Sequence, residues 1–214
     1  MEIDFCKRLL KIIIITQLLI FAKGGNKLFA QTELPHTDSK IQQFDDRVLI
    51  NLAAHRTPEQ TGVMRFLSRN FMYGEAGIPA GLLVGGIISN NREMRENAGY
   101  IASSTAITYG LTLLTKALFK RPRPFVRNLK IIPVYIANQS SFPSGHTSTT
   151  FATATAFSNA YPKWYVIGPS FLWAGATAYS RMYLGVHYPT DVAAGAVLGT
   201  GTAFLLKGPL MGTK

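Results

Sequence analysis

A histidine and an aspartate four positions apart, His187 and Asp191, stand near the C-terminal end of the chain in the stretch from Ser180 to Asp191. Pro189 suits the first turn of a helix, because its φ is already near the helical value and a first-turn N–H would have no partner. We therefore expect His187 just before a helix and Asp191 in its first turn. The carboxylate could then fix the imidazole tautomer and leave the other ring nitrogen free to attack or to take a proton. A capped helix beside a surface histidine fits the same residues, so the pair alone does not establish a reaction.

Two earlier stretches add groups that suit an anion. Lys116 is followed by Arg123-Pro124, and Pro143-Ser144-Gly145-His146 precedes an apolar segment that begins at Thr147. The backbone N–H groups at the start of a helix form an anion site, and a glycine there lets the ligand approach closely. An ordinary turn is the alternative for Pro-Ser-Gly.

The elements that must position these residues are apolar segments rich in small residues, at about 76–90, 98–119, 147–160, 164–180 and 192–206. Several are at or below the length of a membrane span, so each could instead be a buried helix of a soluble bundle. Small residues suit close helix packing in either case. We predict an all-α fold, a helical bundle with five to six membrane-embedded helices and no sheet.

Charge supports an alternating membrane topology. With the N-terminus inside, the basic residues of three connections fall on the cytoplasmic side: Arg92 and Arg95, Lys163, and Lys207 and Lys214. The loop from Lys120 to His146 places further basic residues outside, which indicates another use for those charges. All three stretches described above fall on that same outer side.

Composition agrees with one membrane domain. The 214 residues are 47% hydrophobic and only 15% charged, with a net charge of +11. The basic residues form no nucleic-acid reading motif, so we expect no nucleic acid as a partner. The single cysteine, Cys6, permits no disulfide framework.

We expect three parts along the chain. Residues 1–30 combine basic residues, a short apolar run and small residues near Ala30, as in a signal peptide or an N-terminal anchor. Residues 31–72 contain apolar residues at spacings typical of amphipathic surface helices, the second starting at Thr57-Pro58-Glu59. Residues 73–214 form the bundle.

Meeting at one end, the three stretches would combine two histidines with three cations, Lys116, Arg123 and Arg181. So much positive charge in a dry pocket requires an anion. Phosphate fits best, because a guanidinium binds its oxygens in two-bond geometry and a lysine adds a point charge.

The three stretches, Lys116 with Arg123-Pro124, Pro143-Ser144-Gly145-His146, and Ser180-Arg181 with His187 and Asp191, resemble the signature of the type 2 phosphatidic acid phosphatase superfamily. Three motifs in order with the required internal spacings leave coincidence improbable. The superfamily includes membrane lipid phosphatases, bacterial acid phosphatases and vanadium haloperoxidases.

The resemblance implies a role for each motif residue. His187 would attack phosphorus, Asp191 would orient it, and His146 would act as acid and base. A phosphate cradle would comprise Lys116, Arg123, Ser144, Gly145 and Arg181. We expect no metal and no cofactor, since Asp191 is the only acid after Glu96.

The expected substrate is a phosphorylated lipid or another phosphomonoester or diphosphate, hydrolysed on the periplasmic face of the inner membrane of a bacterial envelope. The sequence does not separate phosphatidic acid, phosphatidylglycerol phosphate, a polyprenyl diphosphate and lipid A phosphate. The main alternative is a soluble periplasmic non-specific acid phosphatase. A haloperoxidase would use the same cradle for vanadate, and a silent binding protein would need a broken motif.

Overall fold

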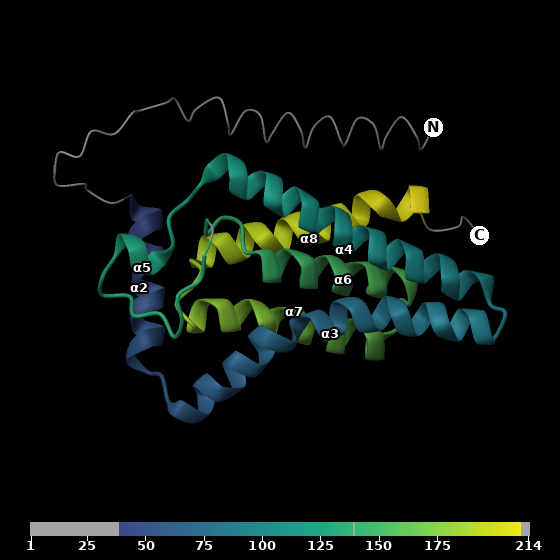
Figure 1. Cartoon of the computed structure of the whole chain (residues 1–214), viewed down its shortest axis with the longest axis horizontal. Helices are drawn as coiled ribbons and strands as arrows, with labels where there is room; N and C mark the ends of the chain where they lie inside the picture. The colour runs from purple at the N-terminus through teal and green to yellow at the C-terminus, as the bar shows by residue number, and fades with distance from the viewer. Residues whose placement is uncertain (1–38, 139, 211–214) are drawn as a thin grey trace. The chain divides into compact units, whose positions relative to one another are not determined.

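The structure is a computed structural model that describes residues 39–138 and 140–210, in which every regular element is a helix (Figure 1). The helices are α2 (Lys40–Ala54), α3 (Pro58–Ile88), α4 (Arg92–Phe119), the short α5 (Pro124–Arg127), α6 (Gly145–Ala160), α7 (Trp164–Tyr183) and α8 (Pro189–Leu210). The prediction of an all-α bundle is confirmed. The leader predicted for residues 1–30 lies outside the described residues.

The five long helices contain the five apolar segments, and local signals explain where they begin. The Thr57 side chain accepts a hydrogen bond from the N–H of Gln60, and Pro58 occupies the first turn of α3. Asn91 caps α4 in the same way, and α8 begins at Pro189. The second expected surface helix and the first apolar segment form one continuous helix, α3, which passes through residue 73. The division of the chain into surface helices and bundle stays a prediction.

Helix α6 packs against α4, α7 and α8, and most of its buried residues are Ser, Thr or Ala. Two glycines of α8 allow the backbones of α6 and α8 to approach closely. A Cβ at Gly195 would lie 2.8 Å from the carbonyl oxygen of Ser144, and one at Gly199 would overlap the backbone of Ser148. This close contact fixes the start of α8 beside the start of α6.

Hydrogen bonds between buried polar groups link α4 to α6 and α8. Thr112 and Ser148 share a hydrogen bond of 2.7 Å between their hydroxyls, and Thr105 and Thr153 share another of 2.7 Å. The Tyr100 hydroxyl donates to the carbonyl of Ala203 at 2.7 Å. These bonds between helices restrict the rotation of α4, α6 and α8 about their axes.

The outward faces of the long helices expose large apolar side chains, among them Leu114, Leu172, Val197 and Phe204. By length and composition, one of the described helices, α3, qualifies as a membrane span. An apolar surface of this extent is typical of a chain that contacts lipid.

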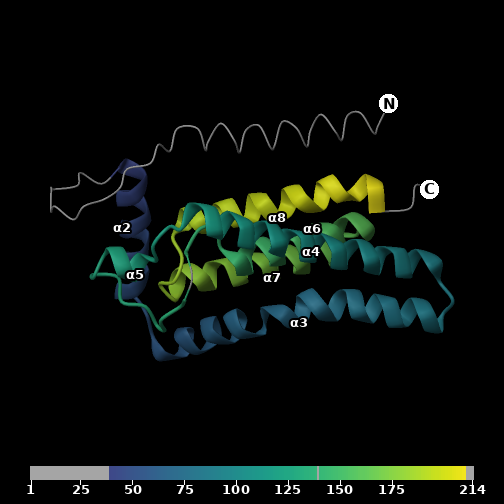
Figure 2. The ribbon, with the colours of Figure 1, turned by 45° about the horizontal axis from the view of Figure 1, so that its top comes forward.

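Helix α2 runs across the ends of the long helices, where α7 ends and α8 begins (Figures 1 and 2). Its face toward the bundle is largely polar: Gln42, Asp45 and Asp46 are buried there together with Leu49. Two of the apolar residues in its expected amphipathic pattern are exposed, Ile41 at 64% and Phe44 at 53%. An inward-facing carboxylate pair requires cationic or N–H partners on the bundle.

Candidate active site

The three motifs meet at the end of the bundle beside α2. Lys116 lies in the last turn of α4, Arg123 directly before α5, Arg181 near the end of α7, and His187 in the connection from α7 to α8. With Gly145 and His146 at the start of α6, these residues line one cavity of about 940 Å³. Segments up to about 70 positions apart in the chain thus present their motif residues to one space.

Two of the eight predicted site residues, Ser144 and Asp191, do not line this cavity. Ser144 is fully buried, and its hydroxyl accepts a hydrogen bond of 2.9 Å from that of Thr147. Its backbone N–H donates to the carbonyl of Asp191 at 3.0 Å. The part of Ser144 in a phosphate cradle stays a prediction. Asp191 lies beneath His187, away from the cavity, as expected of a residue that acts through the imidazole.

The contacts of His187 determine its tautomer. A nitrogen of Arg123, Nη1, lies 3.0 Å from His187 Nε2, and a guanidinium can only donate. Nε2 is therefore the unprotonated nitrogen, and Nδ1 carries the proton. Burial first, and then the charges of Arg123, Arg181 and Lys116, lower the pKa of His187 well below its usual range. The side chain is a neutral imidazole whose lone pair lies at the cavity wall.

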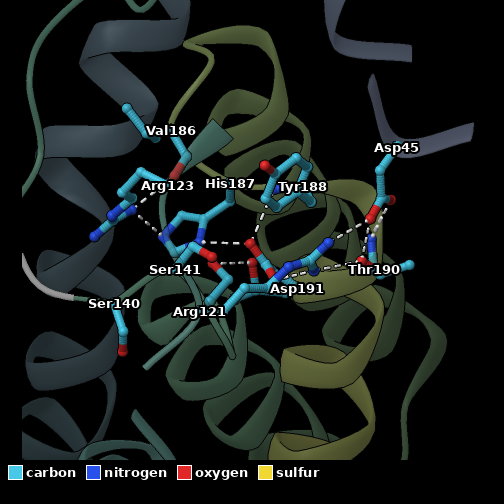
Figure 3. Close-up of polar contacts among 12 residues, drawn as sticks. Asp45, Arg121, Arg123, Ser140, Ser141, Val186, His187, Tyr188, Thr190 and Asp191 are labelled. Carbon is cyan, nitrogen blue, oxygen red and sulfur yellow. Dashed lines mark hydrogen bonds and ion pairs between the residues drawn. The ribbon is translucent and has the colours of Figure 1, made fainter. Parts of the chain in front are cut away.

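Asp191 faces the protonated side of this imidazole. Its Oδ2 lies 3.5 Å from His187 Nδ1, an ion-pair distance that is too long for a well-formed hydrogen bond (Figure 3). The backbone N–H of Tyr188 donates to the same oxygen at 3.0 Å. The carboxylate is thus placed to stabilise a positive charge that develops on the ring.

Three cations surround the cavity, and each is held by backbone or side-chain oxygens. Lys116 Nζ donates to the Ser140 carbonyl at 2.6 Å, and Arg123 donates to the carbonyls of Val186 and Asn138, each at 2.7 Å. Arg181 is almost fully buried. Burial first, and then the charge of Arg181, lower the pKa of Arg123 to about 10, so it remains a cation at neutral pH. The cavity therefore favours an anion.

Helix α3 supplies residues to this site that the motifs do not contain. The ring of Phe71 stacks on that of His146, with centroids 3.9 Å apart and an interplanar angle of 29°. Ser68 accepts a hydrogen bond from Arg181 through its hydroxyl. Glu75, one turn beyond Phe71, is the one carboxylate among the described residues that line the cavity. The helical spacing of Ser68, Phe71 and Glu75 is the signal that could have indicated a common face.

Asp45 and Arg121 are two further residues that sequence reasoning did not assign. The Arg121 guanidinium lies between the carboxylates of Asp191 and Asp45 (Figure 3). Arg121 stands two positions before Arg123, among the basic residues of the outer loop for which another use was expected. Nothing in the sequence around Asp45 indicates its partner, which is 76 positions away.

The sequence profile of the PAP2 superfamily matches residues 97–208, which are more than half of the chain. The chain is 36% identical to the putative undecaprenyl-diphosphatase YbjG of Escherichia coli over 46% of its own length and 50% of the relative's. It is 31% identical to the undecaprenyl-diphosphatase of Sulfolobus acidocaldarius, over 67% of this chain and 68% of that one. The decaprenylphosphoryl-5-phosphoribose phosphatase of Mycobacterium tuberculosis is 36% identical over 53% of this chain and 61% of its own. The matches thus span from half to about two thirds of these relatives.

Two solved structures share the fold. The transmembrane PAP2 type phosphatidylglycerolphosphate phosphatase from Bacillus subtilis superposes with a TM-score of 0.67 at 22% identity, over 80% of this chain and 87% of that one. Aquifex aeolicus LpxE gives a TM-score of 0.65 at 23% identity, over 82% of this chain and 99% of that one. These structures agree with the helical bundle described above. The profile match over more than half of the chain, with the relative from Sulfolobus acidocaldarius, shows that the chain belongs to the PAP2 superfamily.

Proposed function

We propose that this protein is a metal-independent phosphatase that hydrolyses a phosphomonoester or diphosphate of a lipid through a phosphohistidine on His187. The unprotonated Nε2 of His187 beside three cations is the observation that carries the proposal. A neutral imidazole with an available lone pair is a nucleophile, and the cations bind and stabilise a phosphoryl group under attack.

The reaction has two steps. The Nε2 lone pair attacks phosphorus, the bond to the leaving oxygen breaks, and His146 donates a proton to that oxygen. Asp191 stabilises the positive charge that appears on the His187 ring. In the second step His146 takes a proton from water, the resulting oxygen attacks phosphorus, and the P–N bond breaks to release inorganic phosphate and neutral His187. Arg123 must turn from Nε2 toward the phosphate oxygens for the first step to begin.

A lipid substrate is supported by the cavity and by the relatives. Beyond the cations, the cavity continues between α3 and α4 along apolar residues that include Met72, Pro79, Ala102 and Leu113. An apolar wall that leads away from a phosphate site suits a substrate with a hydrocarbon chain. By their names, the relatives given above are two undecaprenyl-diphosphatases, one of them putative, and a decaprenylphosphoryl-5-phosphoribose phosphatase, and a further relative is the lipid A 4'-phosphatase of Bacteroides thetaiotaomicron.

We place the enzyme in the inner membrane of a bacterium with its site toward the periplasm. The end of the bundle opposite the site carries Arg92, Arg95 and Lys163, as the positive-inside rule requires of a cytoplasmic end. The exposed apolar faces of the long helices argue against a soluble periplasmic acid phosphatase, which would present them to water.

The test is release of inorganic phosphate by the full chain purified in detergent. The panel comprises undecaprenyl diphosphate, lipid A, phosphatidic acid, phosphatidylglycerol phosphate and the soluble para-nitrophenyl phosphate. We expect turnover of at least one lipid far above that of the soluble ester, unchanged by EDTA and abolished by His187→Ala. Equal activity of His187→Ala, or activity lost with EDTA, would contradict the proposal.

A further inference from the structure

A chain of charged contacts connects the catalytic histidine to α2. Arg121 Nη1 donates to Asp191 Oδ1 at 2.6 Å, and Arg121 Nη2 donates to Asp45 Oδ2 at 2.8 Å (Figure 3). Both carboxylates are fully buried, and the arginine side chain is only 23% exposed. The order of contacts is therefore Asp45, Arg121, Asp191 and His187.

Asp45 is also bound to the residue that precedes Asp191. The backbone N–H of Thr190 donates to Asp45 Oδ1 at 3.1 Å, and the Thr190 hydroxyl donates to Asp45 Oδ2 at 2.5 Å. The guanidinium of Arg121 lies over the Tyr188 ring, 3.9 Å from its centroid. Contacts on both sides of the first turn of α8 thus limit the movement of the Asp191 side chain.

The charges of these groups suggest why a second carboxylate is present. Asp191 contributes a negative charge to the proposed mechanism. A bidentate arginine paired with Asp191 alone would neutralise that charge. With Asp45, two carboxylates share one guanidinium, and the cluster keeps one net negative charge next to the His187 ring. The cluster can then stabilise the imidazolium that forms on phosphoryl transfer.

We propose that Asp45 and Arg121 are positioning residues for the phosphatase reaction: they hold Asp191 toward His187 and preserve the negative charge that it offers. This inference rests on the proposed function and extends the site beyond the three motifs to α2, which lies outside the family match at residues 97–208.

Helix α2 offers a matched control in the neighbouring residue. The Asp46 carboxylate is also buried, but among the described residues it accepts hydrogen bonds of 2.8 Å from Gln42 and Asn128 and forms no ion pair with Arg121. Asp45→Asn and Asp46→Asn therefore remove the same charge from the same helix with nearly unchanged volume. Only Asp45 contacts the Arg121 guanidinium directly, whereas Asp46 is connected to it through the side chain of Gln42.

The experiment measures kcat and KM of the full chain in detergent micelles with undecaprenyl diphosphate and phosphatidic acid. We expect Asp45→Asn to lower kcat about 10- to 100-fold with little change in KM, because the phosphate cradle is not altered. Arg121→Lys, which keeps the charge but cannot bridge two carboxylates, should act similarly. Asp46→Asn should retain the wild-type kcat. Combined with Asp191→Asn, Asp45→Asn should cause no additional loss, because the residue it positions is already gone.

Equal losses in kcat for Asp45→Asn and Asp46→Asn would overturn the inference, since α2 would then act only by packing. Independent losses from Asp45→Asn and Asp191→Asn would overturn it as well. The proposed function fails separately, if His187→Ala remains active.

A spectroscopic measurement does not depend on turnover. The proton on His187 Nδ1 faces Asp191, so its NMR signal reports the position and charge of that carboxylate. The signal is assigned by its absence in His187→Gln. We expect it to move in Asp45→Asn and to stay in place in Asp46→Asn, and an unchanged signal in Asp45→Asn would contradict the positioning role.

Discussion

The pairing of His187 with Arg123 decides the protonation state of the proposed nucleophile. The guanidinium donates to Nε2, which keeps the proton on Nδ1 toward Asp191, and the surrounding cations disfavour a second proton on the ring. The arginine that would bind phosphate therefore also keeps the histidine neutral. This coupling has a measurable consequence in the pH dependence of the enzyme.

We expect the acid limb of kcat/KM to lie below about pH 6.5, the usual pKa of histidine, because burial and then the charges of Arg123, Arg181 and Lys116 lower the pKa of His187. Arg123→Gln removes one of these charges and should move the limb to higher pH, while Arg127→Gln at an exposed position should leave it in place. If the acid limb of kcat/KM for the wild type lies at or above about pH 6.5, the usual pKa of histidine, this expectation is contradicted. The free energy of unfolding should depend on pH in the same direction. Below about pH 6.5 His187 binds a proton in the unfolded chain but stays neutral in the folded one, so stability declines as the pH falls from there toward the folded pKa.

The sequence could indicate which motif residues lie near one another, because their spacing within each motif is short. The distance from His187 to Asp191, for example, follows from one helix start at Pro189. Asp45 and Arg121 could not be paired in this way, because their contact depends on how α2 packs across the bundle. Neither local periodicity nor net charge contains that information.

At the scale of elements, α3 has two functions. Its outer face is apolar enough for a membrane span, and its inner face contacts His146 and Arg181 through Phe71 and Ser68. The family match begins at residue 97, so this contribution comes from outside the matched stretch. The stack on His146 would restrict the ring of this proposed general acid to one orientation.

We expect Phe71→Ala to lower kcat about 2- to 10-fold, the value of one aromatic contact, because the His146 ring loses its support. The measurement is phosphate release with a lipid substrate under saturating conditions. Phe66→Ala is the control, since Phe66 is exposed on the same helix. An unchanged kcat in Phe71→Ala, or an equal loss in Phe66→Ala, would show that the stack does not position the acid.

The contact of α6 with α8 supports the site from behind. Gly199→Ala would force a methyl group into the backbone of Ser148, and backbone cannot yield as a side chain can. We expect it to destabilise the bundle by about 1 to 3 kcal/mol or more, seen as a lower unfolding temperature in detergent. At Gly201 an added Cβ meets nothing within 4 Å, so Gly201→Ala should be neutral or stabilising. Equal stability of the two variants would contradict the close approach.

Helix positions could be predicted from sequence because the apolar segments, Thr57-Pro58 and Pro189 are local signals. The buried face of α2 could not be predicted in this way. Apolar spacing predicted an amphipathic helix here, but it did not indicate that the face packed on the bundle would carry Asp45 and Asp46. A buried polar face is favourable only where a distant partner such as Arg121 satisfies it.

On the scale of the whole described bundle, the two ends differ in function. The site end combines the motifs, α2 and the loop around α5, and the other end carries the turn between α3 and α4 (Figure 2). The proposed orientation places the site end outside the cell. Because the chain has one cysteine, Cys6, this orientation can be tested by single labels.

We expect an impermeant maleimide to label Leu129→Cys, but not Arg92→Cys, in intact spheroplasts of cells that express each variant in a Cys6→Ser background. Leu129 is 89% exposed at the site end, and Arg92 is exposed at the start of α4 at the other end. Both should react after permeabilisation, which controls for accessibility. The reverse pattern would contradict the periplasmic location of the site.

The covalent intermediate on His187 tests the central claim most directly. Substrate labelled with ³²P in the reacting phosphate is mixed with the full chain, quenched in alkali within the first turnovers, and the labelled peptide is identified. We predict one acid-labile, alkali-stable phosphate on the peptide that contains His187. The amount of this label should increase in His146→Ala if that substitution slows hydrolysis of the phosphohistidine more than its formation. The label should be absent in His187→Ala. Turnover without any labelled protein, or label that persists in His187→Ala, would contradict a phosphohistidine at this position.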